Sequence, residues 1–113
     1  MTPIVYKLVP ADLWRASEAA GVFTGSSADE RDGFIHFSTA QQVRETALRH
    51  FAGVADLLLV AVSAEGLDMR WEPSRGGDLF PHLYGPLPLT AVLWTAALAL
   101  GAGGDHVFPV SLT

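Results

Sequence analysis

The sequence contains no cysteine, and this absence excludes several kinds of chemistry. Without thiols there is no disulfide framework, no cysteine nucleophile and no zinc site built on thiolates. The four histidines do not compensate, because they form no His-x-His or His-x-x-x-His pair of the kind that ligates zinc. The sequence therefore predicts a protein without a metal site.

Positive charge is also scarce. The chain has seven Lys and Arg against twelve Asp and Glu, which gives a formal net charge of −5, and no run of basic residues occurs. Proteins that neutralise the phosphates of a nucleic acid carry a basic patch or stripe. We therefore do not expect a nucleic acid as a partner.

Long hydrophobic runs are missing as well. The most apolar tract, residues 87–100, is shorter than the roughly 20 residues that span a bilayer, and Pro88 lies near its start. Residues 1–7 show no basic segment leading into an apolar stretch, so we expect no secretory signal. These features predict a cytoplasmic protein that does not enter a membrane.

Apolar side chains are abundant, at 50% of the 113 residues. A chain of this length can bury roughly two thirds of the surface that its unfolded form exposes, so it needs no disulfide or metal to hold a core. The length predicts a single domain over residues 1–113.

Strands account for most of the expected elements. Runs of β-branched and apolar residues predict extended segments at 4–9, 33–37, 57–62, 67–71, 80–86, 90–98 and 105–110. In the segment 90–98 the alanines favour a helix, whereas Val92, Trp94 and Thr95 favour a strand, and we predict a strand. The run at 57–62 is apolar throughout, which is typical of a strand buried on both faces and predicts a central place in the sheet. The last segment is expected at an edge of the sheet.

Two helices are expected between these strands. The first runs from Pro10 to Gly21, with Leu13, Ala16 and Ala20 on one apolar stripe.

The second helix follows Thr39, whose spacing to Gln42 is that of a capping box, and it ends near Gly53. Residues 25–32 and 73–78 are rich in small, polar and charged side chains and predict loops. The fold class is therefore α+β, with two helices on a mostly antiparallel sheet.

Two of the expected strands offer a histidine and a hydroxyl on one face. Because side chains alternate along a strand, His36 and Ser38 point to the side opposite Ile35, and His82 and Tyr84 share a face in the same way. Such pairs combine a group that titrates near neutral pH with a donor or acceptor. The alternative is structural, since Ser38 or Thr39 can cap the second helix, and half-buried histidines and tyrosines are common in small cores.

An acid and a base outside these strands are further candidates. Glu72 lies between Trp71 and Pro73, where reduced hydration suits a catalytic base or a group that binds a ribose hydroxyl. The alternative is a solvated loop carboxylate. Arg75, which precedes two glycines, can approach an anion, although its surroundings have no Walker spacing and open no expected helix.

These segments together resemble a bacterial family known as domain of unknown function 952. The resemblance rests on residues 33–39 (GFIHFST), 71–72 (WE) and 80–87 (FPHLYGPL), and it extends over most of the chain. It implies a split sheet similar to that of ADP-ribosyltransferases, whose cleft binds NAD.

The resemblance also implies roles for individual residues. Lys7 takes the place of a His or Arg on the first strand, residues 37–39 resemble a segment that precedes a helix, and Glu72 takes the place of a final glutamate. A lysine cannot make the bidentate contact of a guanidinium. We therefore expect NAD to bind weakly at most, and no cofactor to be required.

The sequence thus predicts a polar cleft that binds a small molecule, with nucleotides as one candidate class. If the protein is an enzyme, the catalytic residues are His36, Glu72 and His82. The residues expected to bind the ligand are Lys7, Ser38, Thr39, Arg75 and Tyr84. The alternative is a non-catalytic binding or interaction module that uses the same cleft for a metabolite or a peptide.

Overall fold

The computed structural model describes residues 3–109, 111 and 112. They form three α-helices, α1 (Ala11–Ala20), α2 (Ser27–Asp32) and α3 (Val43–His50). The strands are β1 (Ile4–Pro10), β2 (Val22–Phe23), β3 (Ile35–His36), β4 (Leu57–Ser63), β5 (Met69–Pro73), β6 (Leu79–Leu83), β7 (Leu87–Pro88) and β8 (Val92–Leu98). In this part of the chain no helix is long and apolar enough to cross a membrane. The class is α+β, as predicted, but with three helices where the sequence predicted two.

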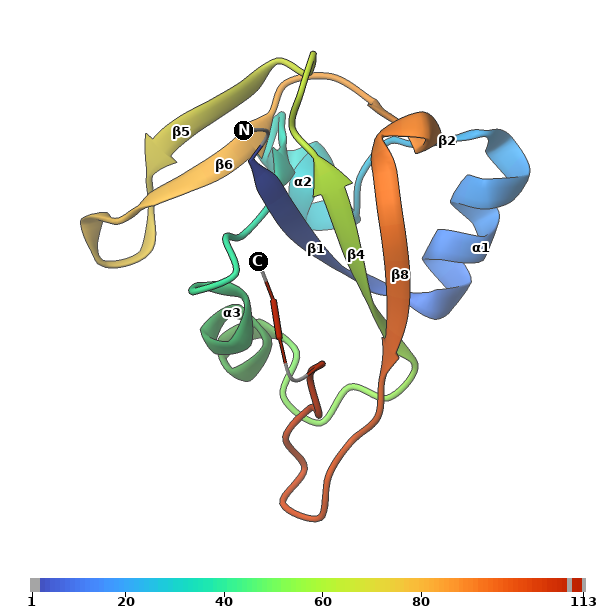
Figure 1. Ribbon diagram of the computed structural model, residues 1–113, viewed down its shortest axis with the longest axis vertical. Coiled ribbons are helices and arrows are strands. Elements are labelled where there is room, and N and C mark those ends of the chain that lie inside the picture. Colours follow the sequence, from blue (N-terminus) through green and yellow to red (C-terminus); the bar gives the residue numbers. More distant parts are fainter. Residues whose placement is uncertain (1–2, 110, 113) are drawn as a thin grey trace.

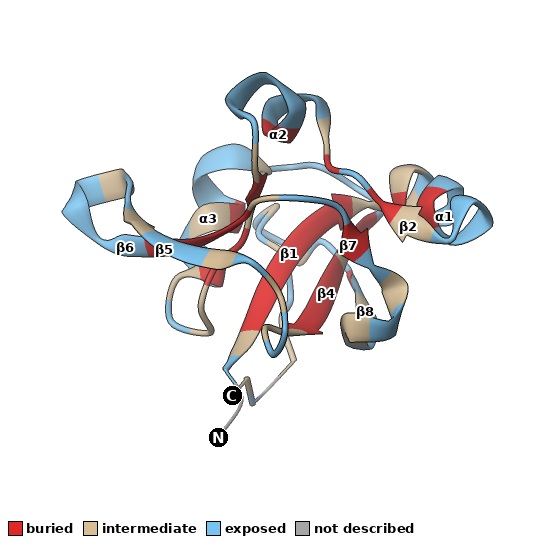
Figure 2. Cartoon of the chain, turned by 90° about the horizontal axis from the view of Figure 1, so that it is seen from above, coloured by how far each residue is buried: buried red, intermediate tan, exposed pale blue. Residues whose placement is uncertain are grey.

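The largest sheet has the strand order β1-β4-β8 and is antiparallel throughout (Figure 1). Its middle strand is β4, so the prediction from the apolar run at 57–62 is confirmed. Apolar side chains cover both faces of this strand, because one face packs toward α1 and the other toward α3. Figure 2 shows β1 and β4 almost entirely buried.

A second sheet, ordered β3-β6-β5, extends to one side of the first, and β2 pairs separately with β7 (Figure 1). The two larger sheets meet at Tyr6 and Ser38, whose backbone groups exchange two hydrogen bonds of 2.8 Å. In the second sheet Ile35 pairs with Leu83, and His36 pairs with His82. In the part of the chain that the structure describes, the two three-stranded sheets are therefore joined by the Tyr6–Ser38 bridge.

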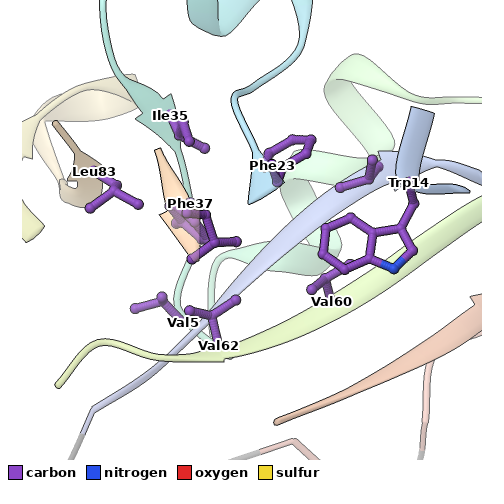
Figure 3. Close-up of a cluster of buried hydrophobic side chains, with 10 residues drawn as sticks. Val5, Trp14, Phe23, Ile35, Phe37, Val60, Val62 and Leu83 are labelled. Carbon is purple, nitrogen blue, oxygen red and sulfur yellow. The ribbon is translucent and has the colours of Figure 1, made fainter. Parts of the chain in front are cut away.

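The main hydrophobic core fills the angle between the two larger sheets (Figure 3). Val5 and Val62 from the first sheet pack with Ile35 and Leu83 from the second, and Phe37 is buried in the same cluster. The expected alternation of the β3 segment is thus confirmed, since Ile35 and Phe37 lie inside. Their burial directs His36 and Ser38 to the opposite side of the segment.

Helix α1 ends as predicted, at Gly21, whose φ of 81° is a left-handed conformation that glycine adopts without strain. The predicted stripe was wrong, because Ala16 and Ala20 are exposed. The helix instead buries Trp14, which packs on Phe23 with 5.6 Å between ring centroids. A large aromatic ring gains more from burial than two alanines, and it therefore decides which face turns inward.

Within residues 25–32, which the sequence predicts to be a loop, residues 27–32 instead form helix α2. The Ser26 side chain accepts a hydrogen bond from the Asp29 N–H, and the Asp29 carboxylate accepts one from the Ser26 N–H, so a capping box starts the helix. Gly33 ends it with a φ of 84°. Apart from Asp29, the helix is exposed, which explains why it shows no apolar periodicity.

The C-terminal segment also differs from the prediction of an edge strand at 105–110. Within residues 105–109 there is only one isolated bridge, between Leu100 and His106, and Val110 lies outside the described residues. Pro109 has no N–H to donate, so a ladder cannot extend through it.

Candidate functional site

A cleft of about 720 Å³ opens where the two larger sheets meet. Side chains from β1, β3, β6, α2 and α3 line it, so segments that are far apart in sequence contribute to one space. Of the predicted site residues, five line the cleft, namely Lys7, His36, Ser38, Arg75 and His82. Three do not, namely Thr39, Glu72 and Tyr84.

One end of the cleft is built around the buried carboxylate of Asp29, which is 2% exposed. Lys7 Nζ lies 3.1 Å and 2.9 Å from its two oxygens, and His36 Nδ1 lies 2.6 Å from Oδ1. The other ring nitrogen of His36 is 2.9 Å from Oδ2 of Asp32, one turn further along α2. We call these four residues the Asp29 cluster.

The charged groups of the Asp29 cluster shift one another's pKa. Burial on its own raises the pKa of the Asp29 carboxyl, but the hydrogen bond from His36, the charge of Lys7 and the N–H of Ser26 outweigh it and hold that pKa well below its ordinary value. Burial lowers the pKa of the Lys7 ammonium, and Asp29 opposes this shift. Lys7 is 8% exposed, so its charge is directed to Asp29 rather than to the open cleft.

His82 forms the second feature of the site. Its Nδ1 lies 2.8 Å from Oε1 of Glu72, which also accepts a hydrogen bond of 2.8 Å from the Tyr84 hydroxyl. The ring of Phe34 stacks on the imidazole, with centroids 4.1 Å apart and an interplanar angle of 21°. Among the described residues no protein group bonds Nε2 of His82, although the residue itself is buried, at 4% exposed.

Glu72 and Tyr84 lie behind His82, outside the lining of the cleft, and the hydrogen bond between them shifts the pKa of both groups. The hydrogen bond from His82, followed by that from Tyr84, lowers the pKa of the Glu72 carboxyl. The bond to Glu72 raises the pKa of the Tyr84 hydroxyl above its ordinary 10.0. An ionised Glu72 that accepts both bonds can fix the orientation of the His82 ring.

The third feature lies around Arg75. Its Nε is 3.1 Å from Glu45, its Nη1 donates to the Thr46 hydroxyl at 3.4 Å, and its guanidinium stacks over Phe80 at 4.9 Å. Ser38 Oγ is 3.0 Å from the Thr46 hydroxyl. His50 is one helical turn beyond Thr46 on α3 and also lines the cleft. We call Ser38, Thr46, His50 and Arg75 the Arg75 cluster.

Thr39, which does not line the cleft, has a structural role before α3. Its hydroxyl accepts a hydrogen bond from the Gln42 N–H, and its own N–H donates to the Gln42 side chain, so the predicted capping box is present just before α3. The Gln42 side chain also donates to the carbonyl of Leu79, which ties this turn to β6. Thr39 therefore shapes one wall of the site without facing the cleft.

Sequence reasoning missed Asp29, Thr46 and His50. The signal for Asp29 is the Ser26-x-x-Asp29 spacing, which is that of a capping box. It lies within residues 25–32, for which the sequence analysis predicts a loop. Thr46 and His50 stand four residues apart, a spacing that places both on one face of a helix. Nothing in the sequence indicated that this face turns toward Arg75, because that contact joins residues 29 positions apart.

The fold and the cleft define an α+β protein with a polar site at the junction of two antiparallel sheets. The chain belongs to the family described as "Protein of unknown function (DUF952)", which matches residues 8–95. The resemblance stated from the sequence motifs is therefore confirmed.

Two solved structures are similar along nearly the whole chain. The crystal structure of protein CC0527 from Caulobacter crescentus is 47% identical, with a TM-score of 0.88 over 92% of this chain and 93% of that one. The solution NMR structure of CC0527 is 48% identical, with a TM-score of 0.82 over 90% of each chain. No curated protein matches the sequence.

Proposed function

We propose that this protein binds a small polar molecule, of the nucleotide class, in the cleft between the two sheets. The observation that carries the proposal is the convergence of Lys7, His36, Ser38, Arg75 and His82 on one cleft of about 720 Å³. Sites for small molecules are typically about 300–1,000 Å³ in volume, with a few polar groups that fix orientation. A nucleotide is of a size that such a volume can hold.

His82 is the group best suited to act on a bound molecule. Its ring is held from behind by Glu72 and Phe34, and Nε2 remains able to donate or accept. Both ring nitrogens of His36, in contrast, already face carboxylates. In this proposal His82 contacts the ligand and is available for proton transfer, whereas Glu72 and Tyr84 are positioning residues.

An ADP-ribosyltransferase-like fold is part of the same proposal. Two antiparallel sheets that join at the Tyr6–Ser38 bridge, with a cleft beside the bridge, support it. The Asp29 cluster argues against the associated NAD chemistry, because the Lys7 ammonium is engaged by both oxygens of Asp29. The proposed ligand is therefore not NAD.

The test is calorimetry with a panel of nucleotides and their nucleosides on the wild-type protein and on Ser27→Trp. Ser27 is exposed and lines the cleft, so an indole there fills the space without removing a core contact. Ser111→Trp is the matched control, since Ser111 is exposed and does not line the cleft. We expect binding that Ser27→Trp abolishes and Ser111→Trp preserves. No binding to the wild type, or equal binding to all three proteins, contradicts the proposal.

A further inference from the structure

The charged side chains of this acidic protein are unevenly placed. Its formal net charge is −5, yet the lining of the cleft contains three of the seven Lys and Arg, three of the four His, and only two of the twelve acids. The cations are Lys7, Arg31 and Arg75, and the acids are Asp29 and Asp32. A concave site enriched in one sign of charge attracts ligands of the opposite sign.

The positively charged side chains at the two ends of the cleft differ in the carboxylates that they meet. Both acids belong to the Asp29 cluster, where they face Lys7 and His36. The Arg75 cluster contains no acid. The carboxylate that meets Arg75 is Glu45, which lies outside the lining, is 56% exposed and contacts the Nε edge of the guanidinium. Glu45 therefore occupies Nε of Arg75 and leaves the Nη2 side of the guanidinium without a carboxylate among the described residues.

We infer that the Arg75 cluster is a phosphate subsite, an inference that rests on the function proposed above. The guanidinium is held by Phe80, Glu45 and Thr46, and its side chain is 19% exposed. In the described residues no protein group bonds Nη2 of Arg75 or the ring nitrogens of His50. These donors therefore remain for a ligand that enters the cleft.

The arrangement suits a phosphate better than a carboxylate. Arg75 comes from a turn and His50 from helix α3, and both line the cleft, so donors from two elements are available to one ligand. The Thr46 hydroxyl donates to the carbonyl of Gln42 and lies within hydrogen-bond distance of Ser38 Oγ and Arg75 Nη1, so it holds Arg75 in place. A phosphate presents three oxygens in a tetrahedral arrangement, whereas a carboxylate presents two in a plane. The subsite thus assigns the ligand a terminal phosphate.

The position of the subsite also places the rest of the ligand. His36 and Ser38 lie two residues apart on one face of the same segment, a separation of about 7 Å along an extended chain. His82 pairs with His36 in the neighbouring strand. A ligand whose phosphate contacts the Arg75 cluster therefore extends past Nε2 of His82 toward the Asp29 cluster.

The test compares ADP with adenosine by calorimetry at low salt. We expect the wild type to bind ADP at least about tenfold more tightly than adenosine, and Arg75→Gln to lose this advantage while its adenosine affinity stays the same. Arg15→Gln removes the same charge from an exposed position on α1 and should keep the advantage. Arg75→Lys retains a cation but not the fork of donors, so an intermediate affinity for ADP is expected.

The outcomes separate the subsite from the proposed function. Equal binding of ADP and adenosine, or an ADP advantage that survives in Arg75→Gln and Arg75→Lys, overturns the phosphate subsite and leaves ligand binding in the cleft intact. Failure of both compounds to bind overturns both. If Arg75→Gln does not fold, Arg75→Lys decides, and wild-type affinity for ADP in that variant contradicts the inference.

Discussion

Asp29 receives more polar contacts than any other side chain of the cleft. Its carboxylate accepts from Lys7 Nζ, from the ring and the backbone of His36, and from the N–H of Ser26. Gly25 approaches it so closely that a Cβ there would lie 2.8 Å from the Asp29 Cβ. This one side chain therefore connects β1, α2 and β3.

Asp29→Asn is expected to lower the free energy of unfolding by about 3 kcal/mol at neutral pH. The substitution leaves the buried ammonium of Lys7 without a counter-charge, and an amide cannot replace it. Urea denaturation measures the effect. Asp78→Asn changes an exposed carboxylate and should alter stability by less than about 0.5 kcal/mol. Similar losses in the two variants would show that the cluster does not stabilise the fold.

The low pKa of Asp29 also predicts a dependence on pH. Because the folded pKa lies below the ordinary 3.8, the ionised carboxylate contributes stability above about pH 4, and this contribution is lost as the pH falls through the folded pKa. Between about pH 5 and pH 2.5 the wild type should therefore lose more stability than Asp29→Asn. Urea midpoints at both pH values measure this difference, and equal losses would contradict the assignment.

The orientation of His82 gives a prediction that NMR can check. With Glu72 accepting at Nδ1, the neutral ring should carry its proton on Nδ1 and leave Nε2 unprotonated. Glu72→Ala should distribute the proton over both nitrogens and return the pKa of Tyr84 toward its ordinary value. Nitrogen-15 shifts of the ring report the tautomer. Glu18→Ala, on the exposed side of α1, is the control, and an unchanged tautomer in Glu72→Ala would refute the positioning role.

At the scale of elements, α2 is a short, exposed helix that supplies two carboxylates to the site. Its first turn depends on the capping box, so Ser26→Ala should cost about 1 kcal/mol and increase amide exchange in α2. Ser27→Ala provides a matched control, because Ser27 is the next residue and makes no capping bond. Equal exchange in the two variants would mean that the cap does not hold α2 in place.

The strands that the sequence predicts correctly contain apolar runs, whereas helix α2, which it misses, does not. β4 is defined by an apolar run, and its position follows from the need to bury those side chains, whereas β8 is apolar in sequence but mostly exposed, with Leu98 its one buried residue. Helix α2 buries one charged residue, so no hydrophobic period marks it, and its only signal is the cap. The edge strand expected near His106 failed because pairing depends on a partner that local sequence does not specify.

At the scale of the whole molecule, the site follows from the packing of the two sheets. The sequence indicated which residue types face outward, and alternation correctly placed Ile35 and Leu83 in the core. It did not indicate that Glu72 and Tyr84 lie behind His82 rather than on the cleft, since this depends on the register of β5 against β6. Long-range register is set by tertiary packing and is not readable from one strand alone.

The assembled cleft predicts that NAD binds weakly and is not cleaved at an appreciable rate. Lys7 is buried against Asp29 and cannot contact a dinucleotide as an exposed guanidinium would. NAD also lacks the terminal phosphate that the Arg75 cluster is proposed to bind. Calorimetry with NAD, followed by product analysis, tests this. Sustained release of nicotinamide that is lost in Glu72→Ala would contradict the account.

The most direct measurement of the central claim is chemical-shift mapping of the isotope-labelled protein during titration with ADP. We predict that the backbone and side-chain signals of Ser38, Arg75 and His82 move together, whereas those of the groove between α3 and the C-terminal segment, lined by Leu48 and Phe108, stay unchanged. Shifts confined to that groove, or no shifts at millimolar ADP, would contradict a ligand site at the junction of the two sheets.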